Sequence, residues 1–292
     1  MTQDAAQFAP FAQRMADEGL PALFIAHFAH YYDKLLGGDD GLIAESDIRP
    51  VEALENAERL APRMTALGRA AIDQAVIIKL NGGLGTSMGL TGPKSLLVVK
   101  ENLTFLDIIA RQAIDVGAPL LLMNSFATEQ QSLEVLARYP QLKRDLPLSF
   151  CQHKQPKVNA TDFRPVLWPD DRELEWCPPG HGDLYTALVT SGMLNRLLDA
   201  GYEYAFVSNA DNLGAVLDPA ILGYMADKQL PFLMEVADRT AADRKGGHLA
   251  RRADGQLLLR EIAQCPAGDL PAFQDIDRHR YFNTNNLWLH LP

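Results

Sequence analysis

The chain has 292 residues, of which 47% are hydrophobic and 22% are charged. This length and this ordinary globular composition exclude a disordered, collagen-like or coiled-coil protein as the main class. The formal net charge is −10, from 27 Lys and Arg against 37 Asp and Glu, which argues against a general nucleic-acid-binding protein. An anionic ligand would therefore need a local set of hydrogen-bond donors.

From the sequence we expect neither a signal peptide nor a membrane span. No apolar stretch reaches the roughly 18 residues that a membrane span needs, and the first residues lack the features of a signal peptide. Cys151, Cys177 and Cys265 are widely spaced and form no CxxC motif, which predicts free thiols and no structural zinc site. We therefore expect a reduced, cytoplasmic protein that binds neither membranes nor nucleic acid.

Residues 1–70 are predicted to form an N-terminal helical region. Apolar residues recur at helical spacing between Leu20 and Tyr31, residues 37–41 form a break, and residues 54–67 resume the helical pattern. His27 and His30 are three residues apart on the first of these helices. No further Cys or His lies near them in sequence, so we interpret them as ordinary helical residues rather than metal ligands.

From residue 71 onward, predicted strands alternate with predicted helices. Thr104 with Asp107, and Thr128 with Gln131, have the spacing of helix capping boxes. Asp254–Gly255 predicts a hairpin between residues 248–252 and 256–262. The helices are expected at 104–117, 128–139 and 184–198, and the strands at 76–80, 96–99, 119–123, 149–152, 204–208, 232–237 and 286–292. This alternation predicts an α/β fold with a mostly parallel sheet covered by helices and an antiparallel addition late in the chain.

A glycine-rich segment directly follows the strand expected at 76–80. Five glycines lie between Gly82 and Gly92, and Lys94 comes two residues later. Closely spaced backbone N–H groups in such a loop bind anions, and the lysine adds a positive charge for phosphate. A Walker A loop is excluded because Pro93 stands directly before the lysine, and the dinucleotide fingerprint fails because Met88 takes its third glycine position.

Three other polar segments stand out, although a turn or capping role is the alternative for each. Residues 178–183 form a Pro- and Gly-rich turn that presents His181, and residues 282–286 carry amides suited to binding hydroxyl groups. Asp211 follows a buried strand, at the sheet edge where ligands bind in α/β folds, and its oxygens suit a divalent cation. Together the segments indicate a nucleotide or sugar-phosphate enzyme that uses a divalent cation.

The glycine-rich segment resembles the signature of the UTP–glucose-1-phosphate uridylyltransferases. The resemblance rests on residues 80–89 and 92–95, and it continues in order through residues 122–126, 178–183, 208–214, 234–236, 245–247, 261–264 and 282–287. Related enzymes for N-acetylhexosamine phosphates typically carry an Ala-Gly-Gly-Gln-Gly-Thr-Arg loop. This chain has Asn81 before the glycines, Leu84 in the glutamine position and Ser87 in the arginine position, which favours glucose 1-phosphate.

The resemblance implies a Rossmann-like nucleotidyltransferase domain over residues 71–292. The implied reaction converts UTP and glucose 1-phosphate into UDP-glucose and pyrophosphate, by direct in-line attack on the α-phosphate without a covalent intermediate and with Mg²⁺ as cofactor. Lys94 would contact the UTP phosphates, Asp211 would bind the metal, and His181 would lie near the sugar phosphate.

The resemblance also implies a set of substrate-binding residues. The expected contacts to uracil and the phosphates are Leu80, Asn81, Gly82, Gly83, Met123, Gln152 and Gly180. The expected contacts to the sugar are Asn209, Glu261, Phe282 and Asn283.

Members of this family usually continue well past the equivalent of residue 292. They complete the catalytic domain, supply a second basic residue to the phosphates, and add a left-handed β-helix that often mediates oligomerisation. The resemblance therefore implies that residues 71–292 form an incomplete catalytic domain without the β-helix, and it suggests a homo-oligomer. Two alternatives stay open: a broader UTP–monosaccharide-1-phosphate uridylyltransferase, and an inactive fragment that binds nucleotide sugars.

Overall fold

The structure is a computed structural model that describes residues 3–85, 92–143 and 145–292. Contacts between residues divide the chain into two compact units. Unit 1 comprises Met1–Gly38, Ile72–Leu217 and His290–Pro292, and unit 2 comprises Asp39–Ala71 and Asp218–Leu289. The predicted domains, 1–70 and 71–292, stay a prediction. Residues 86–91 of the glycine-rich segment, including Ser87 and Met88, lie outside the described residues.

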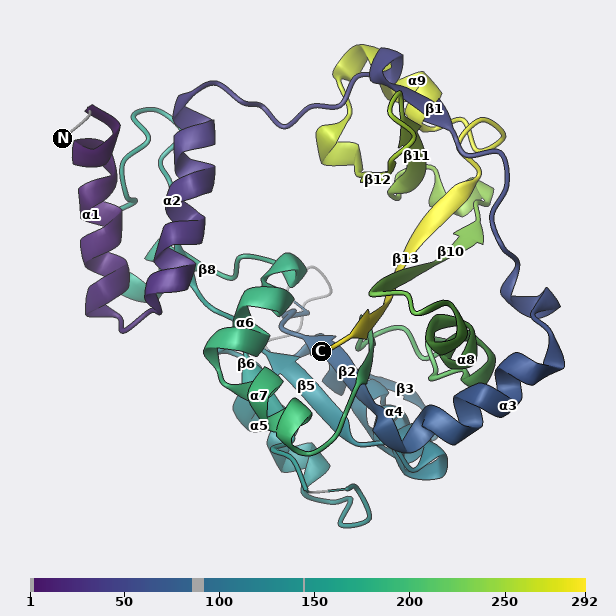
Figure 1. Ribbon diagram of the computed structural model, residues 1–292. Helices are drawn as coiled ribbons and strands as arrows, with labels where there is room; N and C mark the ends of the chain where they lie inside the picture. Colours follow the sequence, from purple (N-terminus) through teal and green to yellow (C-terminus); the bar gives the residue numbers. More distant parts are fainter. Residues whose placement is uncertain (1–2, 86–91, 144) are drawn as a thin grey trace. The chain divides into compact units, whose positions relative to one another are not determined.

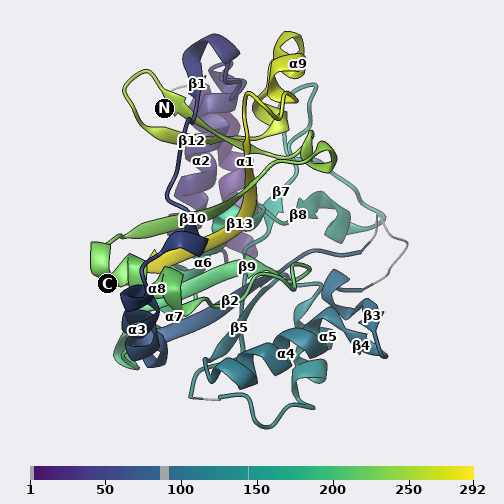
Figure 2. The same ribbon diagram turned by 90° about the vertical axis from the view of Figure 1, so that its right-hand side faces the viewer.

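Unit 1 is built on four parallel strands in the order β9 (Tyr204–Asn209), β2 (Ala75–Asn81), β5 (Leu120–Asn124) and β6 (Ser149–Cys151). Figure 2 shows β9, β2 and β5 side by side, with α4 (Phe105–Val116) and α5 (Glu129–Leu136) on one side of them. β2 and β5 consist mostly of Val, Ile, Leu and Met and are almost wholly buried, as strands covered on both faces are. The predicted α/β class with a mostly parallel sheet is confirmed here.

The predicted capping box at the start of α4 is present. The Thr104 side chain accepts a hydrogen bond from the Asp107 backbone N–H, and the Asp107 carboxylate accepts hydrogen bonds from the Thr104 N–H and hydroxyl. The second predicted box is wrong, because the Thr128 side chain makes no cap hydrogen bond to α5. Its hydroxyl instead accepts a hydrogen bond from the Ser125 N–H, within the turn that leaves β5.

Two further predictions for unit 1 need correction. The helix expected at 184–198 is interrupted: α6 (Leu184–Thr190) and α7 (Met193–Asp199) are separated at Gly192, which has a φ of 72°. The strand expected at 96–99 begins later, as β3 (Val98–Lys100), which pairs with β4 (Leu103–Thr104). Residues 94–96 instead form a short 3-10 helix, with Pro93 at its N-cap. A second small pair joins β7 (Gln155–Pro156) to β8 (Trp176–Cys177).

The N-terminal helices α1 (Gln3–Asp17) and α2 (Ala22–Leu36) lie side by side in unit 1 (Figure 1). The rings of Phe8, Phe11, Phe28 and Tyr32 pack together, with centroids 4.9–6.5 Å apart. The break at residues 37–41 is confirmed, since α2 ends at Leu36. No helix in the described part of the chain is long and apolar enough to cross a membrane.

Unit 2 pairs two helices, α3 (Pro62–Ala71) and α8 (Pro219–Lys228), with a group of antiparallel strands. A Cβ at Gly68 would lie 1.7 Å from the Pro219 carbonyl oxygen, so the two backbones approach closely because a glycine stands at the crossing. The helix expected at 54–67 is wrong for its first half, because α3 begins only at Pro62, a residue that favours the first turn of a helix.

The strands of unit 2 are β1 (Ile48–Pro50), β10 (Phe232–Asp238), β11 (His248–Arg252), β12 (Leu257–Arg260) and β13 (Tyr281–His290), with the short helix α9 (Leu270–Phe273). β11 and β12 form the predicted hairpin around Asp254–Gly255, where Gly255 has a φ of 91°. β10 pairs antiparallel with β13, and β1 with β11. The predicted antiparallel addition late in the chain is therefore confirmed.

Unit 2 also buries charged and titratable side chains. The Arg260 guanidinium and the His279 ring are fully buried, and both hydrogen-bond to the Glu45 carboxylate, at 2.7 and 2.9 Å. His279 stacks on His248 with ring centroids 3.9 Å apart. Burial among these groups lowers the pKa of His248 to about 3, so this ring is neutral in the folded protein.

Candidate nucleotide site

The carboxyl ends of β2, β5, β6 and β9 surround a cavity of about 320 Å³ in unit 1. Ligands of open α/β sheets bind at this edge of the strands, and the volume lies in the range of ligand pockets. Eleven of the fourteen residues predicted to form the site line this one cavity: Leu80, Asn81, Gly82, Gly83, Lys94, Met123, Gln152, Gly180, His181, Asn209 and Asp211.

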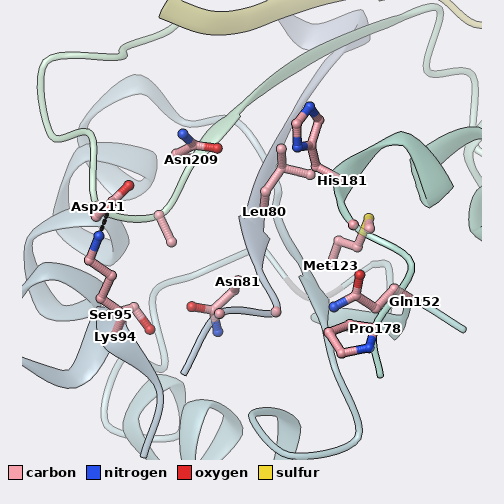
Figure 3. Close-up of a pocket in the computed structure, with 14 residues that line it drawn as sticks. Leu80, Asn81, Lys94, Ser95, Met123, Gln152, Pro178, His181, Asn209 and Asp211 are labelled. Atoms are coloured by element: carbon pink, nitrogen blue, oxygen red, sulfur yellow. Dashed lines mark hydrogen bonds and ion pairs between the residues drawn. The ribbon is translucent and has the colours of Figure 1, made fainter. Parts of the chain in front are cut away.

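One end of the cavity carries opposite charges. Lys94 Nζ lies 2.6 Å from Asp211 Oδ2, and both side chains are partly exposed. Figure 3 shows this pair on one side of the cavity. Lys94 is held at its backbone, because its N–H donates to the Gly83 carbonyl at 3.1 Å. The glycine-rich segment thus brings its lysine to the carboxylate that follows β9.

The other end of the cavity is neutral. Met123, Gln152 and Pro178 lie together on the side opposite Lys94 and Asp211 (Figure 3). A Cβ at Gly82 would lie 2.0 Å from Gln152 Nε2, so the amide of Gln152 rests directly against the glycine. Gly180 borders the same cavity with a φ of 96°, a conformation that other residues adopt only with strain. A thioether, an amide and a backbone without side chains at Gly82 and Gly180 form a surface suited to binding a flat ring that makes hydrogen bonds.

Asn81 lines the cavity, but its side-chain amide is engaged beneath it. Its Nδ2 donates to Asn124 Oδ1 at 2.7 Å and to Ser132 Oγ at 2.8 Å, and the residue is buried. These bonds tie the end of β2 to the end of β5 and to α5. In the described structure, the Asn81 side chain therefore stabilises the strand ends from which the glycine-rich segment departs.

The turn at residues 178–183 is fixed to the end of β6. Asp183 Oδ2 accepts a hydrogen bond of 2.7 Å from the His153 N–H, and the His153 ring nitrogen Nδ1 lies 2.9 Å from both carboxylate oxygens. The His153 ring also stacks on Phe24 of α2, with centroids 4.2 Å apart. His181 itself is exposed at the cavity. The contact between His153 and Asp183 holds Gly180 and His181 in place relative to Gln152.

The remaining predicted residues form a group within unit 2. Asn283 Nδ2 donates to Glu261 Oε1 at 3.2 Å, and the Asn283 N–H donates to the Gly247 carbonyl at 2.9 Å. A Cβ at Gly247 would lie 2.3 Å from Glu261 Oε1, and one at Gly246 would lie 2.1 Å from the Phe282 ring. The two glycines thus allow Glu261 to gather with the adjacent Phe282 and Asn283, although Glu261 and Asn283 are 22 positions apart in sequence.

The described residues offer a single carboxylate for a cation at the cavity. No group of three or more His, Cys, Asp or Glu side chains within residues 3–85, 92–143 and 145–292 could hold a metal ion by itself. Mg²⁺ is commonly bound by one or two carboxylates, with substrate phosphates and water completing its ligands. Asp211 beside Lys94 fits that mode.

The three cysteines are free thiols. Cys151, which ends β6 next to Gln152, is partly buried. Burial and the neighbouring Glu129 raise the pKa of its thiol to about 12, which keeps it protonated. A protonated thiol is a poor nucleophile, so a covalent role for Cys151 is disfavoured.

His27 lies near Thr186, at 3.4 Å from its hydroxyl, rather than in a metal cluster.

Sequence reasoning missed several residues of the site. Ser95, Pro178 and Ala210 also line the cavity, and each belongs to a segment that was singled out for a neighbouring residue. Their position next to Lys94, Gly180 and Asp211 was the available signal. The role of His153 carried no such signal, because its contact with Asp183 joins residues 30 positions apart.

The comparisons with known proteins agree with this geometry. The family model of UTP–glucose-1-phosphate uridylyltransferase matches residues 25–292. A probable UTP–glucose-1-phosphate uridylyltransferase of Schizosaccharomyces pombe is 44% identical over 77% of this chain and 46% of its own length. The Solanum tuberosum enzyme of that name is 42% identical over 80% of this chain and 50% of its own length. The chain thus spans about half the length of these curated relatives.

Solved structures extend the likeness to three dimensions. A mutant UDP-glucose pyrophosphorylase from Leishmania major matches with a TM-score of 0.91 and 40% identity, over 100% of this chain and 64% of that chain. Another mutant of that protein, in complex with UDP-glucose, matches with a TM-score of 0.90 and 41% identity, over 98% and 64%. The predicted nucleotidyltransferase fold is confirmed by these neighbours, and the chain belongs to the UTP–glucose-1-phosphate uridylyltransferase family.

Proposed function

We propose that this chain carries the UTP site of an enzyme that transfers a uridylyl group from UTP to glucose 1-phosphate, giving UDP-glucose and pyrophosphate. The observation that carries the proposal is the polarity of the cavity in unit 1. Lys94 and Asp211 stand at one end, and Met123 and Gln152 at the other. A nucleoside triphosphate is divided in the same way, with a neutral base at one end and charged phosphates at the other.

We propose the following residue roles, of which those for the nucleotide rest on this orientation and those for the sugar on the family resemblance. The uracil would lie against Gly82 and Met123, with its polar edge at Gln152 and Gly180 on the far side. Lys94 would bind the phosphates and stabilise the charge that develops during transfer. The groups proposed to bind the hexose and its phosphate are Asn209, His181, Glu261, Phe282 and Asn283.

The reaction would need positioning more than covalent chemistry. A phosphate oxygen of glucose 1-phosphate forms a bond to the α-phosphorus of UTP, while the bond from that phosphorus to the leaving pyrophosphate breaks. Holding the two anions in line, and neutralising their charge with Lys94, would supply most of the rate enhancement. No nucleophile on the protein is required.

Mg²⁺ is the cofactor that we propose, with Asp211 as its protein ligand. When bound, the ion would neutralise phosphate charge as a Lewis acid. Asp211 also accepts a hydrogen bond from Lys94, so the carboxylate that would hold the cation keeps the lysine at the phosphate end of the cavity.

Several wider statements are also proposals. We propose that residues 71–292 contribute the catalytic domain, that the protein acts in the cytoplasm, and that it forms a homo-oligomer. A broader specificity for monosaccharide 1-phosphates is the second candidate. An inactive nucleotide-sugar-binding fragment is the third, because the chain spans about half the length of its curated relatives.

Pyrophosphate release from this chain with UTP, glucose 1-phosphate and Mg²⁺ tests the proposal. We expect steady release that falls by about 10²–10³ in Lys94→Ala and in Asp211→Ala, because the first removes a positive charge at the phosphates and the second removes the proposed Mg²⁺ ligand. Gln130→Ala, an exposed position on α5, is the surface control and keeps the wild-type rate. Equal turnover of galactose 1-phosphate would favour the broader specificity. UTP binding without any pyrophosphate release would favour the inactive fragment. The absence of both UTP binding and pyrophosphate release would refute the proposal.

A further inference from the structure

Lys79 is a lysine buried in the centre of the parallel sheet of unit 1. It lies on β2 with only 2% of its surface exposed, although lysines are rarely buried unless they are paired. Its Nζ donates to Ser208 Oγ at 2.6 Å and to the Ala215 carbonyl at 2.8 Å, and it lies 5.7 Å from the centre of the Phe206 ring. Lys79 does not line the nucleotide cavity.

The two acceptors of Lys79 stand on either side of the loop that carries Asp211. Ser208 directly precedes Asn209, and Ala215 follows Asp211 by four residues. One Nζ atom therefore joins the start of this loop to its end. Gln112 of α4 supports the middle of the same loop, because its Nε2 donates to the Leu213 carbonyl at 3.0 Å.

We propose that Lys79 is a positioning residue that fixes the loop 209–215, and with it the Asp211 carboxylate, at the phosphate end of the cavity. The proposal rests on the proposed function, since it assigns Asp211 to a cation and phosphates. The Asp211 side chain is one-third exposed, so the loop backbone largely decides where its oxygens lie. The hydrogen bonds from Lys79 Nζ hold the loop at two points, which suits this side chain to the task.

Lys79→Met is the substitution that separates the hydrogen bonds from the packing. The Lys79 side chain borders a cavity of about 160 Å³, together with Ile77, Ile109 and Ala113, so the methionine has room. Calorimetry would give the affinity for UTP with and without Mg²⁺. We expect the strengthening of UTP binding by Mg²⁺ to shrink by about tenfold or more, as when residues behind a metal ligand are changed. UTP binding without Mg²⁺ should change by less than about twofold.

A second background tests whether Lys79 acts through Asp211. In Asp211→Asn, adding Lys79→Met should cause no further loss of Mg²⁺-dependent binding, because the group that Lys79 positions is already gone. Tyr202→Phe is the matched control: Tyr202 is buried, and its hydroxyl donates to Asp145 Oδ2 at 2.5 Å. It loses one hydrogen bond in unit 1 but should keep the full effect of Mg²⁺.

Two results would overturn the proposal. One is a loss of UTP affinity in Lys79→Met that is equal with and without Mg²⁺, and the other is a loss that persists undiminished in Asp211→Asn. If Lys79→Met does not fold, Ser208→Ala removes one of the two bonds without changing charge. It should reduce the effect of Mg²⁺ by a smaller factor, and an unchanged effect would overturn the proposal.

Failure of the proposed function is distinguishable from failure of this inference. If the wild-type chain binds no UTP, the proposed function fails for this chain, and hydrogen exchange decides the role of Lys79. Faster exchange of the amides of residues 209–215 in Lys79→Met, with unchanged exchange in β5, would support a loop held by Lys79. Unchanged exchange in residues 209–215 would refute it.

Discussion

Gly82→Ala probes the neutral end of the cavity, where Gln152 is proposed to bind the base. A Cβ at Gly82 would lie 2.0 Å from Gln152 Nε2 and 3.0 Å from its Cδ, and the three nearest atoms all belong to that side chain. The new methyl group must therefore displace the amide of Gln152. Because no backbone atom is among those neighbours, β2 itself can stay in place.

The size of the effect follows from the contact that is lost. A hydrogen bond contributes about 0.5–1.5 kcal/mol net, and 1.4 kcal/mol corresponds to a factor of about ten in affinity. We expect Gly82→Ala to weaken UTP binding by about tenfold. Folding stability should fall by only about 1 kcal/mol, because the atoms that must move are the far end of a flexible side chain.

A double-mutant cycle measured by UTP calorimetry tests the reason for the loss. If Gly82→Ala acts by displacing Gln152, it should cost nothing further in a Gln152→Ala background. Gly83→Ala is the steric control, since a Cβ there meets no heavy atom of the described residues within 4 Å and should show no coupling to Gln152. Unchanged affinity in Gly82→Ala, or losses that simply add in the double variant, would refute the reasoning.

Three further predictions concern stability, each measured by urea unfolding. Burial alone would raise the pKa of Asp107, but hydrogen bonds from Thr104 and the charge of Arg138 hold that pKa below its usual value. The ionised carboxylate therefore stabilises the fold. This stabilisation is present above about pH 4 and is lost as the pH falls through the lowered pKa. Asp107→Asn should cost about 2 kcal/mol at pH 7, and an unchanged midpoint would contradict this. Gly223→Ala should cost about 3 kcal/mol or more, because the new Cβ would lie 1.9 Å from a carbonyl oxygen of α3; a wild-type midpoint would show that the helices can separate freely. Burial lowers the pKa of His248 to about 3, so stability should fall by up to about 1.4 kcal/mol per pH unit as the pH drops from about 6.5 toward 3. His248→Gln should flatten that slope, and an identical slope in both proteins would count against a neutral buried ring.

The sheet of unit 1 and most of the cavity were predictable from the sequence. Strands β2, β5 and β9 are largely apolar, and the polar residues that follow them must lie at one edge of a parallel sheet. Lys94 and Asp211 were predicted on this basis and on the resemblance. The structure adds that they form an ion pair 117 residues apart in sequence.

Other features could not be read from local patterns. The close crossing of α3 and α8 depends on Gly68 and Gly223, whose separate positions in the sequence give no sign of their proximity. The helix expected at 184–198 breaks at Gly192. This break could not be predicted, because a single glycine is tolerated in some helices and ends others. Lys79 lies within an apolar run, and only the loop that folds back beside β2 shows what it binds.

The measurement that tests the account most directly is the affinity of the chain for UTP and for uridine, in the wild type and in Lys94→Ala. If the cavity holds the base at Gln152 and the phosphates at Lys94, the substitution should weaken UTP binding by about tenfold or more and leave uridine binding unchanged. Equal weakening of both ligands, or UTP binding that does not depend on Lys94, would contradict the proposed orientation of the nucleotide.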